Sequence, residues 1–425
     1  MGEHDMTIDV ATVELNASTP LAERARDLVP LFDRHAAFAD ENSLLAPEAV
    51  TALHEAGLLK MWVPTDLGGF ELSPRQSLEV IALTSYGDSS AGWVQMAASL
   101  SIGTAGSYLG ETAIKELFGE GRYPVIAGQG TAPGTARTVD GGFRLTGSWS
   151  FASGLRHGDH IHTLGIIEDT GEARIFVVPV ENADLKLDSW DVMGLRGTGS
   201  IDYTITDAFV PEDYSHFAFT REPLHGGSLY RLGIIGIAVV CHSGWATGVG
   251  RRLLDELSAL VRSKRGRPGS LADSDAFRIG LAKTEGRFRA AIALVDSDAF
   301  RINLAKTEAR FRAAVALVGE SWADVEASIE AGRAITVRQD TLVRIALGNI
   351  TDALADVASF VYLSGGTTAL RKGSPIERLV RDVHAGTQHI TSGPGMWRAA
   401  GEELVGAGEN KQWVLLDLVD TAPPA

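Results

Sequence analysis

The hydrophobic period of this chain changes twice along its length, and this feature most limits its possible folds. Apolar residues recur at helical spacing from residue 20 to about 122, for example in LAERARDLVPLFDRHA. Between about 123 and 212 the spacing shortens to that of strands, and from about 226 the helical period returns. We therefore expect a mainly α protein with a central β domain: an N-terminal helical domain (1–122), a β domain (123–222) and a C-terminal helical bundle (223–425).

The central segment reads as a compact β domain. Asp140-Gly141-Gly142 separates ARTV from FRLTG, which is a hairpin signal. HIHTLGII, ARIFVVPV, LKLDSWDV and SIDYTITDAFV follow at about ten-residue spacing and are rich in β-branched and aromatic residues. No βαβ pattern and no GxGxxG motif occurs, so we do not expect a Rossmann nucleotide site.

Charge and cysteine content exclude several classes. The net charge of −16 would repel nucleic acids and anionic membranes. Cys241 is the single cysteine, so one chain can build neither a disulfide nor a cysteine zinc site, which fits the cytoplasm. The start, MGEHDMTIDV, lacks the basic region of a signal peptide. The most apolar run, 232–250, contains His242, Ser243 and several glycines, which favours a buried core helix over a membrane span.

A 23-residue tandem duplication lies in the C-terminal region: DSDAFRIGLAKTEGRFRAAIALV (273–295) is followed at once by DSDAFRINLAKTEARFRAAVALV (296–318). On a straight helix the second apolar stripe would be rotated by roughly 140° from the first, at about 100° per residue. We expect one copy to fill the bundle position and the other to protrude or pack elsewhere. The second copy is the better helix former, because it replaces both glycines of the first, and each glycine costs about 1 kcal/mol.

Four stretches resemble the acyl-CoA dehydrogenase fold: GLLKMWVPTDLGG, GFRLTGSWSFASGLRHGD, DSWDVMGLRGTGSIDYTITDAFVP and LSGGTTALRKGSPIERLVRD. They occur in the family's order from about residue 20 to 400. The resemblance implies a helical domain, a β-barrel or sandwich and a four-helix bundle, with a flavin between the β domain and the bundle. It also implies a homotetramer formed through the bundle.

Candidate flavin contacts follow the strand that ends in WSFASG. Trp149 and Phe151 offer flat apolar surface to the flavin ring. Ser153 can hydrogen-bond the ring edge, and Gly154 permits close backbone approach.

Further candidates stand outside this strand. The segment 130–136, with Thr131, could supply backbone donors on the other side of the pocket. Arg262 matches the arginine that contacts cofactor phosphate in the family and stands in a local basic cluster.

The resemblance also says which chemistry is missing. A dehydrogenase of this fold places a glutamate base at one of two positions, occupied here by Ala385 and Tyr230. Instead, RDVHAGTQH resembles the oxygenase components of two-component flavin monooxygenases, with His389 over the flavin as the base and Ser153 at flavin N5. A histidine titrating near neutrality suits that role.

The implied function is therefore monooxygenation. Reduced FMN or FAD and O₂ would form a C4a-hydroperoxyflavin, which hydroxylates a small aromatic or electron-rich substrate while water is excluded. A separate NAD(P)H:flavin reductase would deliver reduced flavin by diffusion. The alternatives are an N- or S-oxygenase, an acyl-CoA dehydrogenase-like oxidoreductase, and a non-catalytic flavoprotein.

Trp93, Tyr230 and His384 are the candidate substrate contacts. We expect no metal, because His384 and His389 would lie about 140° apart around a helix and could not chelate as a pair. Arg381 and Asp382 are expected to anchor their helix to its neighbours.

Overall fold

The structure is a computed structural model that describes residues 19–263, 299–365, 369 and 372–421. The N-terminal helices are α1 (Pro20–Asn42), α2 (Pro47–Glu55), α3 (Pro74–Gly87), α4 (Ser89–Tyr108) and α5 (Glu111–Phe118). Side chains cap the starts of α1, α3 and α4. The Thr19 side chain accepts from the Ala22 backbone N–H, Ser73 and Gln76 form a capping box, and Asp88 accepts from the first turn of α4.

The β domain follows directly. Its strands are β1 (Ile126–Val139), β2 (Gly142–Ala152), β3 (His160–Ile167), β4 (Ala173–Pro179), β5 (Ala183–Lys186), β6 (Ile201–Pro211) and β7 (Ser215–Phe217). They form one sheet in the order β5-β6-β2-β1-β3-β4-β7. The predicted hairpin is confirmed, because β1 and β2 pair antiparallel with Val139 opposite Gly142. The pairing of β2 with β6 is irregular between Trp149 and Ala152, and this bulge decides the site geometry below.

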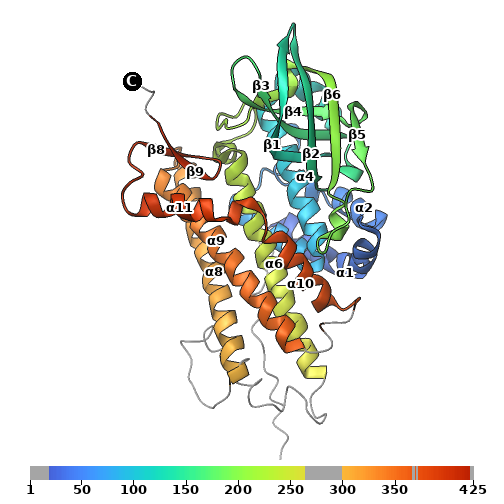
Figure 1. Ribbon diagram of the computed structural model, residues 1–425, viewed down its shortest axis with the longest axis vertical. Helices are drawn as coiled ribbons and strands as arrows, with labels where there is room; N and C mark the ends of the chain where they lie inside the picture. The colour runs from blue at the N-terminus through green and yellow to red at the C-terminus, as the bar shows by residue number, and fades with distance from the viewer. Residues whose placement is uncertain (1–18, 264–298, 366–368, 370–371, 422–425) are drawn as a thin grey trace, which may run out of the picture.

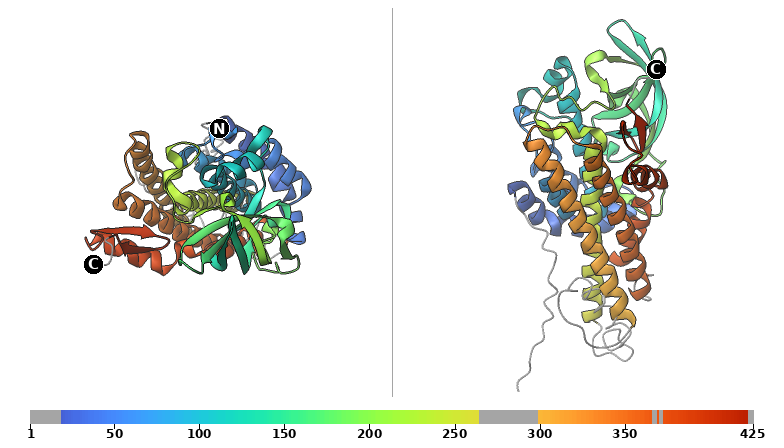
Figure 2. Two further views of the ribbon diagram at one scale, coloured as in Figure 1. Left: turned by 90° about the horizontal axis from the view of Figure 1, so that it is seen from above. Right: turned by 90° about the vertical axis from the view of Figure 1, so that its left-hand side faces the viewer.

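The C-terminal part is a bundle of long helices (Figures 1 and 2). It contains α6 (Gly233–Ser263), α8 (Ala299–Glu330), α9 (Val337–Gly365), α10 (Pro375–Gly386) and α11 (Pro394–Leu404). A hairpin of β8 (Lys411–Val414) and β9 (Asp417–Asp420) follows and was not predicted. The sequence predicts His384 and His389 on one helix, but α10 ends at Gly386, so His389 lies beyond it. The architecture confirms the predicted fold class, mainly α with a central sheet.

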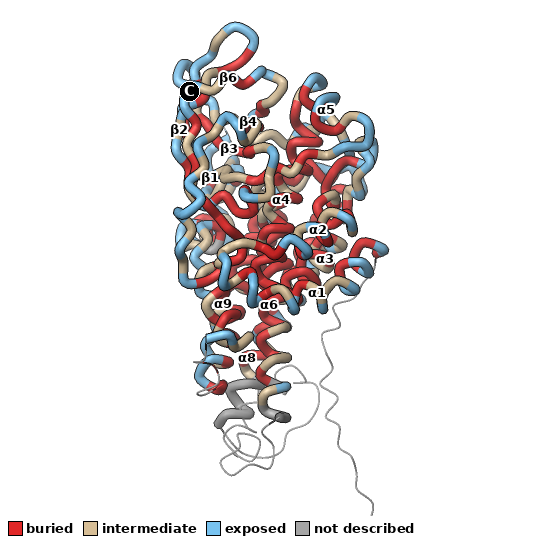
Figure 3. Tube along the Cα trace, turned by 90° about the vertical axis from the view of Figure 1, so that its right-hand side faces the viewer, coloured by how far each residue is buried: buried red, intermediate tan, exposed pale blue. Residues whose placement is uncertain are grey.

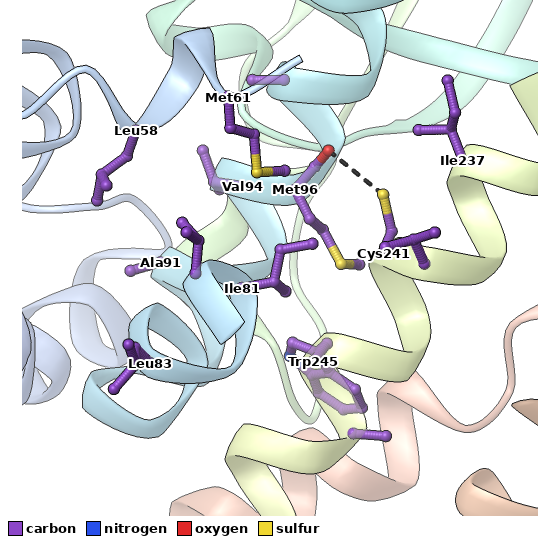
Figure 4. Packing of buried hydrophobic residues seen from close by; sticks show 14 of the residues in the cluster. Leu58, Met61, Ile81, Leu83, Ala91, Val94, Met96, Ile237, Cys241 and Trp245 are labelled. Carbon is purple, nitrogen blue, oxygen red and sulfur yellow. Dashed lines mark hydrogen bonds between the residues drawn. The ribbon is translucent and has the colours of Figure 1, made fainter. Parts of the chain in front are cut away.

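Buried residues are concentrated where the N-terminal helices meet the bundle (Figure 3). α6 packs against α3, α4 and α9. Figure 4 shows α4 and α6 side by side, with Cys241 Sγ donating to the Met96 carbonyl at 3.6 Å. The segment Ser228–Leu257 is long and apolar enough to cross a membrane, but 72% of its most apolar window is buried inside the protein. This burial agrees with the predicted core helix.

The duplication is only partly within the described residues. The second copy begins α8, where Phe311, Ala314 and Val318 are buried in the core. A Cβ added at Gly250 of α6 would lie 2.2 Å from the Phe311 ring, so the two helices are in close contact there. The first copy, 273–295, lies outside the described residues. The prediction that one copy protrudes or packs away from the bundle concerns these same residues and stays a prediction.

Candidate active site

Four rings from three distant segments meet between α4, α6 and the end of α10. Trp93 of α4 lies 5.2 Å from His242 and 5.1 Å from Trp245, both on α6, and 6.1 Å from His389, measured between ring centroids. His242 and His389 lie 4.2 Å apart. We call Trp93, His242, Trp245 and His389 the ring cluster. The structure thus brings together two predicted residues, Trp93 and His389, and adds two that were not predicted.

The backbone around the ring cluster fits it closely. Trp245 Nε1 donates to the Ser89 carbonyl at 3.0 Å, which fixes the α6 ring against the start of α4. At the end of α10, a Cβ on Gly386 would lie 2.4 Å from the Trp245 ring. Any side chain at that position would push α10 away from α6. This glycine is therefore required for His389 to reach the cluster.

Ser153 is joined to the ring cluster by a hydrogen bond. Trp93 Nε1 donates to Ser153 Oγ at 3.1 Å. Ser153 Oγ lies 2.8 Å from Ser200 Oγ, which lies 2.7 Å from Thr198 Oγ1. Thr198 Oγ1 in turn donates to the Leu195 carbonyl at 2.8 Å. We call Ser153, Ser200 and Thr198 the hydroxyl chain.

Burial keeps both histidines neutral at physiological pH. Desolvation lowers the pKa of His389 to about 4. Burial, and then the neighbouring His389, lower the pKa of His242 below its usual value. His389 Nδ1 lies 2.9 Å from Thr391 Oγ1, so this hydroxyl holds one ring nitrogen.

A small cavity of about 10 Å³ lies against the two histidines, which is room for roughly one water molecule. Its lining residues are His242, Trp245, Ala246, Thr351, Leu354, Gly386, Thr387 and His389. No arginine, lysine, aspartate or glutamate is among these described residues.

Phe151 is displayed on the surface by an unusual backbone. Its φ is 69°, a left-handed value that costs an aromatic residue about 1–3 kcal/mol, and its side chain is 65% exposed. The ring meets Trp190 edge-on at 6.0 Å. The neighbouring Gly154 has φ 78°, and its N–H donates to the Thr198 carbonyl at 3.0 Å. An aromatic ring that is held exposed by a strained backbone, as at Phe151, is typical of a ligand-binding surface.

Trp149 requires a correction. The sequence suggested that it presents a ring face to the flavin, but it is 2% exposed and stacks on Tyr203 at 5.2 Å. Its Nε1 donates to the Leu164 carbonyl at 3.2 Å inside the β-domain core. Residues two apart in a regular strand share a face, but the bulge after Trp149 turns Phe151 outward.

Some of the backbone hydrogen-bond donors in the loop at Thr131 already have partners within the loop. Gln129 Oε1 accepts from the backbone N–H groups of Thr131 and Ala132, both at 3.0 Å. These two donors are therefore used within the loop. Arg262 lies in the last turn of α6, and its side chain is outside the described residues.

Two predicted substrate contacts lie elsewhere. Tyr230 is fully buried, and its hydroxyl donates to the Trp62 carbonyl at 2.6 Å, away from the ring cluster. Burial raises its pKa, so it is a neutral packing residue. His384 is exposed on α10. Neither residue is in the ring cluster or among the residues that line the small cavity. The helical angle between His384 and His389 also does not apply, because α10 ends between them.

The expected anchoring by Arg381 and Asp382 is confirmed. Arg381 pairs with Asp40 of α1 at 3.0 Å and with Glu377 at 2.5 Å. Asp382 accepts from the Leu195 backbone N–H at 2.6 Å and from the Ser89 hydroxyl. One helical turn thus ties α10 to the N-terminal helices and to the loop that leads into the hydroxyl chain.

The residues fit a flavin ring. An exposed aromatic face, a glycine turn and a buried serine oxygen lie next to one another at Phe151, Ser153 and Gly154. A flat heteroaromatic ring system with a polar edge is the kind of ligand that this combination holds. A flavin held by these residues would border the ring cluster on the side of Ser153, through Trp93.

Comparisons with known proteins agree on one kind of enzyme. The family described as acyl-CoA dehydrogenase, C-terminal domain, matches residues 293–393. Indole-3-acetate monooxygenase from Pseudomonas putida is 30% identical over 376 residues, covering 86% of this chain and 89% of the relative. The flavin-dependent monooxygenase oxygenase subunit HsaA from Rhodococcus jostii is 24% identical, covering 88% of this chain and 94% of the relative. The structure of XiaF from Streptomyces sp. in complex with FADH2 and glycerol matches with a TM-score of 0.78 at 22% identity, covering 91% of this chain and 95% of that one.

Proposed function

Because the chain belongs to the flavin-dependent monooxygenases that serve as oxygenase components and have the acyl-CoA dehydrogenase fold, we propose that it hydroxylates a small, uncharged aromatic molecule of the indole or phenol type. Reduced flavin and O₂ are its co-substrates, and a separate reductase supplies the flavin. We further propose that this reductase is NAD(P)H-dependent and delivers the flavin by diffusion. The oxygenase itself would be a homotetramer in the cytoplasm.

The composition of the ring cluster supports this substrate class. Trp93 and Trp245 offer aromatic surface, and neutral His242 and His389 offer hydrogen bonds without charge. No charged side chain lines the cavity among the described residues, and burying an unpaired carboxylate there would cost several kcal/mol. The part of the substrate that enters the cavity is therefore an uncharged ring. Because the cavity holds about 10 Å³, side chains of the cluster must move to admit it.

The site residues bind the flavin and remove a proton from the substrate. Bound reduced flavin supplies the electrons with which O₂ delivers one oxygen atom to the substrate and the other to water. Phe151 packs on the flavin ring, and Ser153 accepts a hydrogen bond at its edge. His389 is the base: Thr391 holds its Nδ1 through the hydroxyl at 2.9 Å and the backbone N–H at 3.4 Å, and in the tautomer whose Nδ1–H donates to the hydroxyl, the Nε2 lone pair takes the O–H or N–H proton of the substrate.

The test is a coupled assay with a flavin reductase, NADH, FAD or FMN, and ¹⁸O₂. Indole, phenol and indole-3-acetate are offered separately, and product, ¹⁸O incorporation and H₂O₂ are measured. We expect one ¹⁸O atom in a product of indole or phenol. His389→Gln should lower product formation by about 10²–10⁴-fold, the usual contribution of a general base, while H₂O₂ release continues.

An exposed histidine near the end of α10 provides the control. His384→Gln should leave product formation unchanged, because its side chain points to solvent. Oxygen in the product that derives from water, or a clear preference for indole-3-acetate over indole, would contradict the proposal.

A further inference from the structure

The hydroxyl chain has only one possible direction of hydrogen bonding, and this direction assigns a role to two residues outside the flavin and substrate contacts. We propose that Ser200 and Thr198 are positioning residues that turn Ser153 into an obligate hydrogen-bond acceptor, so that the site prefers reduced over oxidised flavin. The inference rests on the proposed function, since it takes flavin as the ligand at Ser153.

The Leu195 end of the hydroxyl chain fixes its direction, and the Trp93 end is compatible with that direction. At one end the indole N–H of Trp93 can only donate, and at the other the Leu195 carbonyl can only accept. Each hydroxyl in between has a single hydrogen. Thr198 gives its hydrogen to the Leu195 carbonyl, so Ser200 must donate to Thr198, and Ser153 must donate to Ser200.

The surroundings prevent a reversal. Ser153 is 8% exposed, and Ser200 and Thr198 are each 2% exposed, so bulk water does not offer alternative partners. The Trp93 ring is held by its three neighbours in the ring cluster. The backbone adds a second constraint. The Gly154 N–H donates to the Thr198 carbonyl, and this bond holds the segment with Ser153 at a fixed distance from the segment with Thr198 and Ser200.

As a consequence, Ser153 has no hydrogen left to donate to a ligand. A hydroxyl oxygen has two lone pairs, and one accepts from Trp93, so one lone pair of Ser153 remains for a ligand. Flavin N5 carries a hydrogen when the ring is reduced and is a bare acceptor when it is oxidised. The reduced ring can donate to Ser153, whereas the oxidised ring faces it lone pair to lone pair.

Removing the acceptor of the Ser153 hydrogen should change this preference. In Ser200→Ala, Ser153 can rotate its hydrogen toward the ligand and donate to oxidised flavin, while it can still accept from reduced flavin. We expect oxidised flavin to bind about tenfold more tightly and reduced flavin to change by less than about twofold, since one hydrogen bond contributes roughly a factor of two to ten. A purely structural role for Ser200 would instead weaken both forms.

The experiment measures binding rather than turnover. Dissociation constants for FAD and FADH₂ are determined by anaerobic titration, and the potential of the bound flavin is measured independently. A tenfold lower ratio of the oxidised to the reduced dissociation constant corresponds to a potential about 30 mV more negative for a two-electron couple. Ser200→Thr retains the hydroxyl and should restore the wild-type ratio.

Ser148→Ala is the matched control. Ser148 is an exposed serine of β2, the strand that ends just before Ser153, and its hydroxyl lies 3.0 Å from the hydroxyl of Thr204. This substitution should leave the ratio unchanged. If wild type discriminates between the two flavin forms and Ser200→Ala does not alter the ratio, or weakens both forms equally, the inference is wrong although the proposed function stands. If wild type binds neither form, the proposed function fails and the inference falls with it.

Discussion

Replacing Asp382 by asparagine is expected to stabilise the protein at neutral pH, although it removes a charge from a hydrogen-bonded network. Asp382 is 1% exposed, and burial raises the pKa of its carboxyl to about 6. The hydrogen bonds from Ser89 and Leu195 and the nearby Arg378 act in the opposite direction but do not compensate, and Asp88 adds repulsion. The ionised form is therefore less favourable in the folded protein than in the unfolded chain.

The size of the effect follows from the difference between the two pKa values. A rise from 3.8 to about 6 corresponds to about 3 kcal/mol of lost stability once the group is ionised in both states, at 1.36 kcal/mol per pKa unit. Because the folded state holds its proton longer, stability falls as the pH rises from about 4 to about 6. Asparagine keeps both contacts: its oxygen accepts from the Leu195 N–H, and its amide donates to the Ser89 oxygen.

Urea denaturation of wild type and Asp382→Asn at pH 5 and pH 8 tests this reasoning. We expect the variant to be more stable by up to about 3 kcal/mol at pH 8, with a gap roughly half as large at pH 5. Asp188→Asn, at an exposed aspartate, is the control and should show no gap. A variant less stable than wild type at pH 8 would mean that Arg378 and Ser89 stabilise the ionised carboxylate, which would refute the assignment.

Three further predictions concern other parts of the chain. Glu308→Gln should lower the free energy of unfolding by about 1–3 kcal/mol, because Arg251 loses its buried partner at 2.9 Å and keeps only Asp255 as a counter-charge among the described residues; urea denaturation measures this. The pH profile of kcat/KM should show no loss between pH 8 and pH 5 from protonation of His389, whose pKa is about 4; an acid limb near 6.5 that disappears in His389→Gln would contradict this. Phe151→Gly should leave thermal stability equal or higher, because glycine tolerates φ 69°, while flavin binding weakens several-fold in titration; a drop in Tm would show instead that the ring supports the fold.

The sequence was sufficient to predict the order of the domains. It was insufficient where the backbone departs from regular geometry or where a side chain could point in more than one direction. The alternation of helical and strand periods was sufficient for the α-β-α order, and the pattern around His389 selected a residue that the structure places in the ring cluster. Trp149 was misplaced because period-two alternation assumes a regular strand, and a bulge next to it cannot be recognised from residue types. Tyr230 was misplaced because its match to a catalytic position says nothing about the direction of its side chain.

His242 was noticed only as an interruption of an apolar segment. A lone histidine in such a helix is usually a packed core residue, and nothing local distinguishes one that faces another histidine 147 residues along the chain. The same holds for Ser200 and Thr198, which read as ordinary residues between a glycine-rich turn and a strand. Pairings across such distances depend on tertiary packing, which residue periodicity does not encode.

The wide spacing of the site along the chain also has a consequence during protein synthesis. Trp93 and Ser153 leave the ribosome long before His389, and α10 must dock on α1 and α4 before the ring cluster can close. A chain made only as far as the β domain lacks His389 and the other late residues that line the small cavity. The C-terminal helices, which are made last, therefore decide when the ring cluster is complete.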